Sequence, residues 1–369
     1  MEHRLEDVAD FEALLRTANE CEKGVRWKAS VQMFEIDKLR WIARLSHDTN
    51  NLTYKGMGFK RFDIMERGKL RHIQSVHISE RTVQKSLCNN AIRPEVYPRL
   101  IYDNSASQKG KGTEFALKRL KEHLRWHYAR YGTKGGILLI DNHDYFASID
   151  HKIAIDEIAK HFTDDGIKHY VSYFIDAFDG DTGLGLGSEI SQVSANYYLN
   201  DMDKAIKERF RIHGYARYMD DSYVISDSIG LLKRIRSFIE ESSLRYSIEL
   251  NQKKTVIVRL KNEFEYLKKN IRLTDTGKIV MSILPKNIRA ERRKIRIQRR
   301  EYDAGRMLKE SIWQSYQSWR GYARKYNNYE AVGTMDHYFN KIMKGVDFND
   351  CRKRKRNNGE ELQADAKTA

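Results

Sequence analysis

The spacing of apolar residues changes near residue 56. Apolar positions recur with helical period through FEALL and VQMFEIDKLRWIARL, and no proline interrupts them, which predicts a helical cap over residues 1–55. From Phe59 the period shortens to two. The runs FKRFDIM and LRHIQSVHI alternate on either side of ERGK, the pattern of a β-hairpin with a glycine-containing turn.

The middle of the chain alternates between loops, helices and short apolar strands. A Gly- and Lys-rich loop (YDNSASQKGKG) opens a long helix, and the strand GGILLID follows it. A Gly-rich stretch then opens another helix before ARYMDDSYVI, where runs of aromatic and β-branched residues flank two acids. This arrangement predicts a hairpin with Asp220 and Asp221 at its tip. A helix near 230–246 and the strand pair SIELNQKKTVIVRL complete this part.

The last third is helical, dense in Arg and Lys, and interleaved with aromatic residues. Two interpretations fit the segment from Pro285 to Tyr326: a basic groove for nucleic acid, or a helical bundle whose core includes Trp313 and Trp319. The C-terminal stretch CRKRKRNNGEELQADAKTA is charged and poor in apolar residues, which predicts a disordered tail.

The amino-acid composition indicates what kind of partner the protein binds. The 369 residues are 40% hydrophobic, enough for a sizeable core in two or three domains or subdomains. Lys and Arg number 67 against 51 Asp and Glu, a net charge of +16, and the sequence pI is about 9.5. Such an excess favours a polyanionic partner, RNA or DNA, over a merely well-solvated basic surface.

Cysteine usage and hydropathy indicate the cellular compartment in which the protein is expected. Only Cys21, Cys88 and Cys351 occur, too few and too far apart for a disulfide framework or a zinc pair. The N-terminus is acidic and amphipathic, and no apolar run approaches the roughly 20 residues of a membrane span. We therefore expect a cytoplasmic protein without a signal peptide, anchor or membrane partner.

Three carboxylates carry the candidate chemistry. The strand GILLI leads directly into Asp141, and a second strand delivers Asp220 and Asp221, so two strand ends could bring these acids together. Such a cluster requires cations, and carboxylate oxygens suit Mg²⁺, with Mn²⁺ as an alternative. Two such ions would support in-line phosphoryl or nucleotidyl transfer. The other interpretation is that the Asp pair only forms a turn.

The order of these segments resembles the palm of reverse transcriptases, from about Phe59 to Lys344. IDNHDYFASIDH resembles the first catalytic motif, YMDD the second, and LNQKKT the segment with a catalytic lysine. The resemblance implies metal ligation by Asp141, the Asn142 carbonyl, Asp220 and Asp221, and pyrophosphate protonation by Lys254. It also implies that Phe146 excludes a ribose 2′-hydroxyl, and that Lys69 and Arg71 grip the incoming triphosphate of a dNTP.

LGSEISQ is similar to the reverse transcriptases of diversity-generating retroelements, which copy a template RNA with errors at adenine. Here Leu186 stands where many relatives have a glutamine that touches the nucleotide, so we expect Leu186, Gly187 and Gln192 to line a permissive dNTP site. We expect Lys109 and Lys111, in the loop YDNSASQKGKG, to contact nucleic acid. In the basic helical segment we expect the same of Arg293, Arg296, Trp319 and Arg320.

The resemblance implies an α+β right hand: fingers, a palm with an antiparallel sheet, and an α-helical thumb. The expected ranges are a cap (1–55), fingers and palm (56–278), a basic thumb (279–346) and the tail (347–369). The expected partners are template RNA, an RNA–DNA hybrid, dNTPs, and an accessory protein or second polymerase. Two alternatives stay open: an antiphage defence reverse transcriptase acting with its own noncoding RNA, and a non-catalytic RNA-binding protein on a polymerase scaffold.

Overall fold

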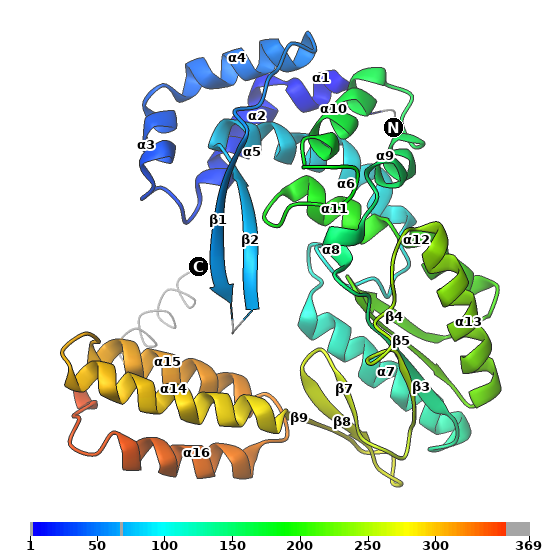
Figure 1. Ribbon diagram of the computed structural model, residues 1–369, viewed down its shortest axis with the longest axis vertical. Helices are drawn as coiled ribbons and strands as arrows, with labels where there is room; N and C mark the ends of the chain where they lie inside the picture. Colours follow the sequence, from blue (N-terminus) through cyan, green and yellow to red (C-terminus); the bar gives the residue numbers. More distant parts are fainter. Residues whose placement is uncertain (1–2, 67–68, 352–369) are drawn as a thin grey trace, which may run out of the picture. The chain divides into compact units, whose positions relative to one another are not determined.

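The chain forms two compact units, Met1–Arg259 and Leu260–Ala369 (Figure 1). The computed structural model describes residues 3–66 and 69–351, except for the side chains of Glu66 and Lys69. Both units combine helices with antiparallel sheets. The fold class is therefore α+β of the right-hand polymerase kind, as the sequence predicted. The division after Arg259 differs from the boundary predicted at residue 278.

The N-terminal helices belong to the main core of the first unit. Asp10 begins the second of them by accepting a hydrogen bond from the Ala13 amide at 2.8 Å. Val8, Leu14 and Ile42 are fully buried in the same cluster as the palm residues Leu138 and Val224. The predicted cap thus shares one core with the rest of the unit; its helices are α1 (Leu5–Ala9), α2 (Phe11–Glu22), α3 (Ala29–Ile36) and α4 (Lys38–Asn50).

The fingers hairpin consists of β1 (Phe59–Glu66) and β2 (Lys69–Val76), paired antiparallel along their whole length. Phe59 stacks on Phe178 with ring centroids 5.1 Å apart, and Ile73 forms an isolated parallel bridge with Leu186. Gly185 allows this approach, because a Cβ there would lie 2.5 Å from the Gln74 side-chain oxygen. The hairpin therefore packs on the loop that carries LGSEISQ.

A helical layer connects the hairpin to the palm and supplies most of the remaining core. It begins directly after β2 with α5, whose N-cap His77 accepts a hydrogen bond from the Ser79 amide at 3.3 Å. Its members are α5 (Ile78–Leu87), the π-helix η1 (Cys88–Ile92), α6 (Arg93–Val96), the 3₁₀-helix η2 (Tyr97–Arg99), α8 (Tyr145–Ser148), α9 (His151–Ala159), α10 (Asp165–Asp176) and α11 (Glu189–Tyr197).

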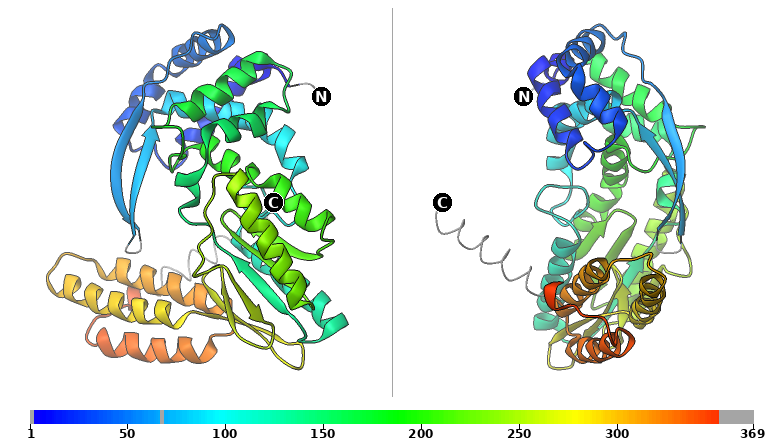
Figure 2. Two further views of the ribbon diagram at one scale, coloured as in Figure 1. Left: turned by 45° about the vertical axis from the view of Figure 1, so that its right-hand side comes forward. Right: turned by 90° about the vertical axis from the view of Figure 1, so that its left-hand side faces the viewer.

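The palm sheet has four antiparallel strands in the order β4-β5-β3-β6. They are β3 (Gly136–Ile140), β4 (Gly214–Tyr218), β5 (Asp221–Ser226) and β6 (Val256–Arg259). Because helices cover the sheet, β3, β4 and β5 are buried along most of their length rather than alternating. The helices that pack on it are α7 (Thr113–Tyr131), α12 (Asn200–Glu208) and α13 (Ile229–Arg245), and Figure 2 gives two further views.

Within its described residues, 260–351, the second unit joins a three-stranded antiparallel sheet to three helices. Trp313 and Trp319 pack against the helical core, and Tyr316 and Phe339 stack at its centre with centroids 3.9 Å apart. These aromatic residues therefore form a bundle core. The elements are β7 (Phe264–Tyr266), β8 (Lys269–Leu273), β9 (Ile279–Ile283), α14 (Pro285–Asp303), α15 (Lys309–Arg324) and α16 (Tyr329–Ile342).

Two parts of the predicted domain layout differ from this unit. The sheet β7–β9 groups with the helices, although residues up to 278 were predicted to belong to the fingers and palm. Phe348 and Cys351, predicted as part of the tail, are buried in the helical core. The rest of the predicted tail, residues 352–369, lies outside the described residues.

Candidate active site

The register of the palm sheet brings the candidate carboxylates to one edge. The last pair between β3 and β5 is Ile140 with Ser222, so the next step places Asp141 opposite Asp221. Tyr218 pairs with Asp221 across a two-residue turn, in which Met219 adopts a left-handed backbone (φ 53°) and Asp220 follows it. Two antiparallel strands therefore deliver all three acids to the same end of the sheet.

Residues 250–255, the segment LNQKKT, hold the Asp141 side chain in place. Its carboxylate accepts hydrogen bonds from the Lys254 ammonium at 2.8 and 3.0 Å and from the Asn251 amide at 3.0 Å. The hydrogen bond to Asp141 raises the pKa of Lys254 above its ordinary value. Partial burial opposes this shift, and the charges of Asp141, Asp221 and Asp220 add to it. Lys254 thus keeps its proton and stays beside the carboxylates.

The donor set at this edge fits a divalent cation in chemical type. Asp141, Asp220 and Asp221 offer the hard oxygen ligands that Mg²⁺ and Mn²⁺ prefer, and a cationic group, the Lys254 ammonium, already rests on Asp141. In residues 3–66 and 69–351, however, no three His, Cys, Asp or Glu side chains are close enough together to hold a metal ion.

Asn142 contributes its backbone to this edge. It forms an antiparallel bridge with Leu250 through two flanking hydrogen bonds, from the His143 amide to Glu249 and from the Asn251 amide to Asp141, each 2.8 Å long. In this bridge type the peptide groups of Asn142 itself face away from Leu250. Its side-chain amide lies 3.5 Å from the Asp220 carbonyl. The Asn142 carbonyl remains a predicted metal contact.

A buried ion pair that the sequence reasoning missed supports the turn. The Arg217 side chain is 1% exposed and donates three hydrogen bonds of 2.7–2.9 Å to Asp203, which is fully buried on α12. The same guanidinium donates to the Met219 carbonyl at 3.2 Å and the Asn196 carbonyl at 2.8 Å. Burial alone would lower the pKa of Arg217, but Asp203 raises it. A fixed cation therefore holds the turn that carries Asp220.

The predicted nucleotide-binding residues lie on β2, α8 and α11 and in the loop before α11. Phe146, on α8, is half-buried against the main core. Leu186 is half-buried at its bridge with Ile73, and Gly187 takes a left-handed φ of 107°. Gln192 is exposed and lies 3.4 Å from the Ser107 hydroxyl. Arg71 and Lys69 lie on β2; the Lys69 side chain falls outside what is described.

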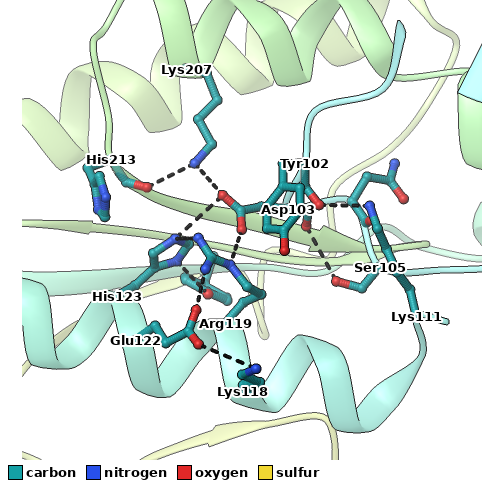
Figure 3. A network of polar contacts seen from close by, with 12 residues as sticks. Tyr102, Asp103, Ser105, Lys111, Lys118, Arg119, Glu122, His123, Lys207 and His213 are labelled. Carbon is teal, nitrogen blue, oxygen red and sulfur yellow. Dashed lines mark hydrogen bonds and ion pairs between the residues drawn. The ribbon is translucent and has the colours of Figure 1, made fainter. Parts of the chain in front are cut away.

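The two lysines of the loop before α7 have different surroundings. Lys109 is exposed. Lys111 donates hydrogen bonds to the Tyr102 carbonyl at 2.8 Å and the Asn104 carbonyl at 3.0 Å, and its ammonium lies 5.2 Å from the Tyr102 ring. Figure 3 shows this contact beside the Asp103 network. The Lys111 ammonium thus fixes the loop, whereas Lys109 remains a predicted nucleic-acid contact.

Asp103 anchors the same loop to the palm. Burial alone would raise the pKa of Asp103, but hydrogen bonds from His123, Lys207 and Arg119 lower it below the usual range (Figure 3). The backbone also pairs with strand β4, since the Ser105 amide donates to the Arg217 carbonyl at 3.0 Å. The loop therefore extends the edge of the palm sheet.

The second unit separates the predicted nucleic-acid contacts into two groups. Arg293 and Arg296 are exposed on α14. Trp319 is half-buried and stacks on Tyr316, with centroids 6.0 Å apart. Arg320 is paired with Asp336 through hydrogen bonds of 2.8, 2.9 and 3.0 Å. Arg293 and Arg296 remain predicted nucleic-acid contacts, whereas Trp319 and Arg320 pack against or pair with other side chains of the unit.

Comparison with known proteins identifies a family model for more than half of the chain. The model described as reverse transcriptase (RNA-dependent DNA polymerase) matches residues 59–271, which include Asp141, Asp220 and Asp221. A search of curated proteins gave no significant match. In the described residues, no helix is both long and apolar enough to cross a membrane.

Similar solved structures include three telomerases. Apo telomerase from Candida tropicalis, truncated from its C-terminal domain, is 15% identical with a TM-score of 0.46, covering 60% of this chain and 54% of its own. The other apo structure from Candida tropicalis is 12% identical (TM-score 0.49; 67% and 52%). Telomerase from Candida albicans, in complex with a TWJ fragment of telomeric RNA, is 10% identical (0.47; 86% and 65%). The chain thus spans 52–65% of the lengths of these structures.

Proposed function

The chain belongs to the reverse transcriptase (RNA-dependent DNA polymerase) family, and from this membership we propose that it copies an RNA template into DNA by in-line nucleotidyl transfer. The observation that carries the proposal is the sheet register, which sets Asp141 opposite Asp221 with Asp220 in the adjoining turn. A turn-forming Asp pair alone would not require a third acid on the neighbouring strand.

Divalent metal ions serve the chemistry of this family, and we propose Mg²⁺ here, with Mn²⁺ as a substitute. The residues that would hold it are Asp141, Asp220 and Asp221, with the Asn142 carbonyl. When bound, the ion activates the attacking hydroxyl and neutralises charge on the phosphates. Chelation of divalent ions should therefore abolish DNA synthesis, and added Mg²⁺ should restore it.

The protein's own side chains supply the remaining steps. Lys254 keeps a proton on Nζ at the carboxylate edge, supported by its raised pKa, and donates it to the leaving pyrophosphate. Phe146 excludes a ribose 2′-hydroxyl by its bulk. Arg71 and Lys69 bind the triphosphate, one as a planar fork and the other as a point charge.

The biological role we propose is error-prone copying of a dedicated structured RNA, as in diversity-generating retroelements. Leu186 supports this role, because an apolar side chain cannot give the nucleotide a hydrogen bond, and its bridge to Ile73 keeps it beside the fingers hairpin. Leu186→Gln should lower misincorporation opposite template adenine, measured by sequencing the cDNA. An unchanged error spectrum would refute the role of Leu186.

The decisive experiment is primer extension on an RNA template with Mg²⁺ and labelled dNTPs or NTPs, followed by sequencing. Asp220→Asn should abolish extension, while Asp165→Asn, on a side chain that is 95% exposed, should not. Errors concentrated at template adenines would support the diversification role. An even error spectrum would still support polymerase activity, but it would favour a defence role with the enzyme's own noncoding RNA. No synthesis even with cognate RNA and partner would remove the catalytic proposal and favour RNA binding alone.

A further inference from the structure

A second cationic surface lies on the first unit, away from the carboxylates. It is a groove of about 840 Å³ between the residues that follow α12 and one side of α13. Its cations are Arg209, Lys233, Arg234 and Arg245, and its single acid is Glu241. We call these residues, with Phe210 and Phe238, the palm groove. All four cations are exposed.

The groove faces away from the sheet that carries the active site. Helix α13 buries Leu232, Ile235 and Ile239, and it packs on β3, β5 and β6. Lys233 and Arg234 follow Leu232 in the sequence but point away from the buried face of α13, and both are exposed. Because α13 stands between these cations and the sheet, the palm groove cannot serve the reacting atoms.

The cations of the palm groove are not neutralised by carboxylates. Arg236, on the same helix, is paired with Glu240 at 2.9 Å, and Lys254 at the active site is paired with Asp141 at 2.8 Å. By contrast, Arg209, Lys233, Arg234 and Arg245 form no ion pair in the part of the chain that the structure describes. Four unpaired cations against one acid create a local positive potential that attracts an anionic ligand.

The length and the rings of the groove indicate the kind of anion. Lys233 and Arg245 are twelve helical residues apart, about 18 Å, far longer than one phosphate requires. Phe210 and Phe238 lie 5.1 Å apart, and the Arg209 guanidinium sits 5.6 and 5.5 Å from their centroids. Unpaired bases stack on aromatic and guanidinium planes while cations follow the backbone.

We propose that the palm groove binds a single-stranded segment of RNA outside the catalytic cleft. The choice of RNA over DNA rests on the proposed function, since the template RNA is the nucleic acid that such an enzyme must retain during synthesis. The Ser237 and Ser242 hydroxyls, which also line the groove, can hydrogen-bond phosphate or 2′-hydroxyl groups.

The test is a binding titration on the full chain, with the catalytic cleft saturated by an RNA–DNA hybrid. The probe is a labelled single-stranded RNA of about 20 nucleotides, long enough to follow the groove. The neutralising triple variant Lys233→Gln, Arg234→Gln, Arg245→Gln should weaken binding at least about tenfold. It should also lower the slope of log K against log salt by about 2, since each single-strand contact contributes about 0.7.

The matched control removes the same charge from exposed cations elsewhere that form no ion pair in the described residues: Lys23→Gln, Arg16→Gln, Lys152→Gln. It should keep both the affinity and the salt slope. Equal losses in the two triple variants, or none in the groove variant, would overturn the proposal. If instead the groove variant lost affinity only for poly-glutamate, the surface would be a docking site for an acidic protein and the RNA proposal would fail.

Two further measurements separate base stacking and catalysis from this result. Phe238→Leu keeps an apolar side chain of similar bulk, yet should weaken RNA binding about tenfold through lost stacking. Unchanged RNA affinity in this variant would refute the stacking contact. Extension of a short primed hybrid should be unaffected in the groove variant. Because the titration needs no catalysis, absence of extension in the wild type would refute the proposed function and leave the binding result standing.

Discussion

The buried Arg217–Asp203 pair should determine both the stability of the palm and the rate of DNA synthesis. Neither charge can reach water, because the Arg217 and Asp203 side chains are 1% and 0% exposed. Replacing Asp203 by Asn leaves the guanidinium without a carboxylate. Replacing Arg217 by Met leaves Asp203 with the hydroxyl of Tyr215. Either change strands one buried charge, which is the costly way to disrupt such a pair.

The expected magnitude follows from what each variant leaves behind. Stranding one charge of a buried pair costs about 3–5 kcal/mol, a large share of the stability of a typical protein. The double variant Asp203→Asn, Arg217→Met removes both charges, and its amide oxygen can still accept from Tyr215. We therefore expect the double variant to lose less unfolding free energy than either single variant.

The double variant should regain stability relative to the single variants, but it should not regain the rate of DNA synthesis. Arg217→Met removes the charged hydrogen bond of 3.2 Å that the guanidinium donates to the Met219 carbonyl. Such a bond contributes about 1.5–3 kcal/mol. If the turn that carries Asp220 depends on it, single-nucleotide incorporation should slow roughly 10- to 100-fold in both variants that lack Arg217.

The assays are urea unfolding followed by far-UV circular dichroism, and single-turnover incorporation on a primed RNA template. Asp165→Asn serves as the exposed control. A double variant less stable than both single variants would contradict the stranded-charge account. Wild-type incorporation in the double variant would show that Arg217 does not position the turn, whatever its effect on stability.

Three further changes probe other contacts. Lys254→Gln should slow incorporation roughly 10²- to 10⁴-fold, the range for a lost general acid, in single-turnover assays; an equal loss in Lys253→Gln, at an exposed neighbour, would contradict the assignment. Burial first, and the charge of Lys268 second, lower the pKa of Lys269 to about 8. The folded state therefore binds fewer protons than the unfolded chain as pH rises from about 8 to the ordinary lysine value, so the unfolding free energy should increase across that window. Lys269→Met should remove this increase in pH-dependent urea unfolding, and Lys268→Met should keep most of it, because burial is the larger cause. Gly185→Ala should cost about 1–3 kcal/mol by overpacking, because its Cβ would lie 2.5 Å from neighbouring side chains; unchanged hydrogen exchange in β2 would refute this.

Local patterns were enough to predict the elements that carry the site. The alternating runs from Phe59 gave the hairpin β1–β2, and the apolar run before Asp141 gave β3. For β3 the apolar run agrees with burial, whereas the hairpin was predicted by alternation alone, since Phe62, Ile64 and Leu70 are exposed. The expected strand pair around LNQKKT gave only β6, with Leu250 reduced to an isolated bridge. The sheet β7–β9 was missed, since short strands at a unit boundary lack a clear period.

The long-range contacts of the site were beyond local patterns. Asp203 and Arg217 come from a helix and a strand, and no spacing rule joins them. One signal was available: Arg217 interrupts the buried run GYARY, and a charged residue in such a strand requires a carboxylate partner. Lys111 illustrates the opposite case, because its charge suggested nucleic acid while its ammonium binds two backbone carbonyls.

Ion pairing divides the cations of this chain into two kinds. Arg217, Lys254 and Arg320 each bind a carboxylate, and each fixes a turn, a strand end or a helix. The exposed cations of the palm groove, and Arg293 and Arg296 on α14, form no ion pair in the part of the chain that is described. A paired cation adds little to the field that a polyanion meets, because its carboxylate cancels most of its charge at a distance. The net charge of +16 should therefore act mainly through the unpaired group. Neutralising Arg293 and Arg296 should lower the salt dependence of RNA binding, whereas removing a paired cation should change stability first.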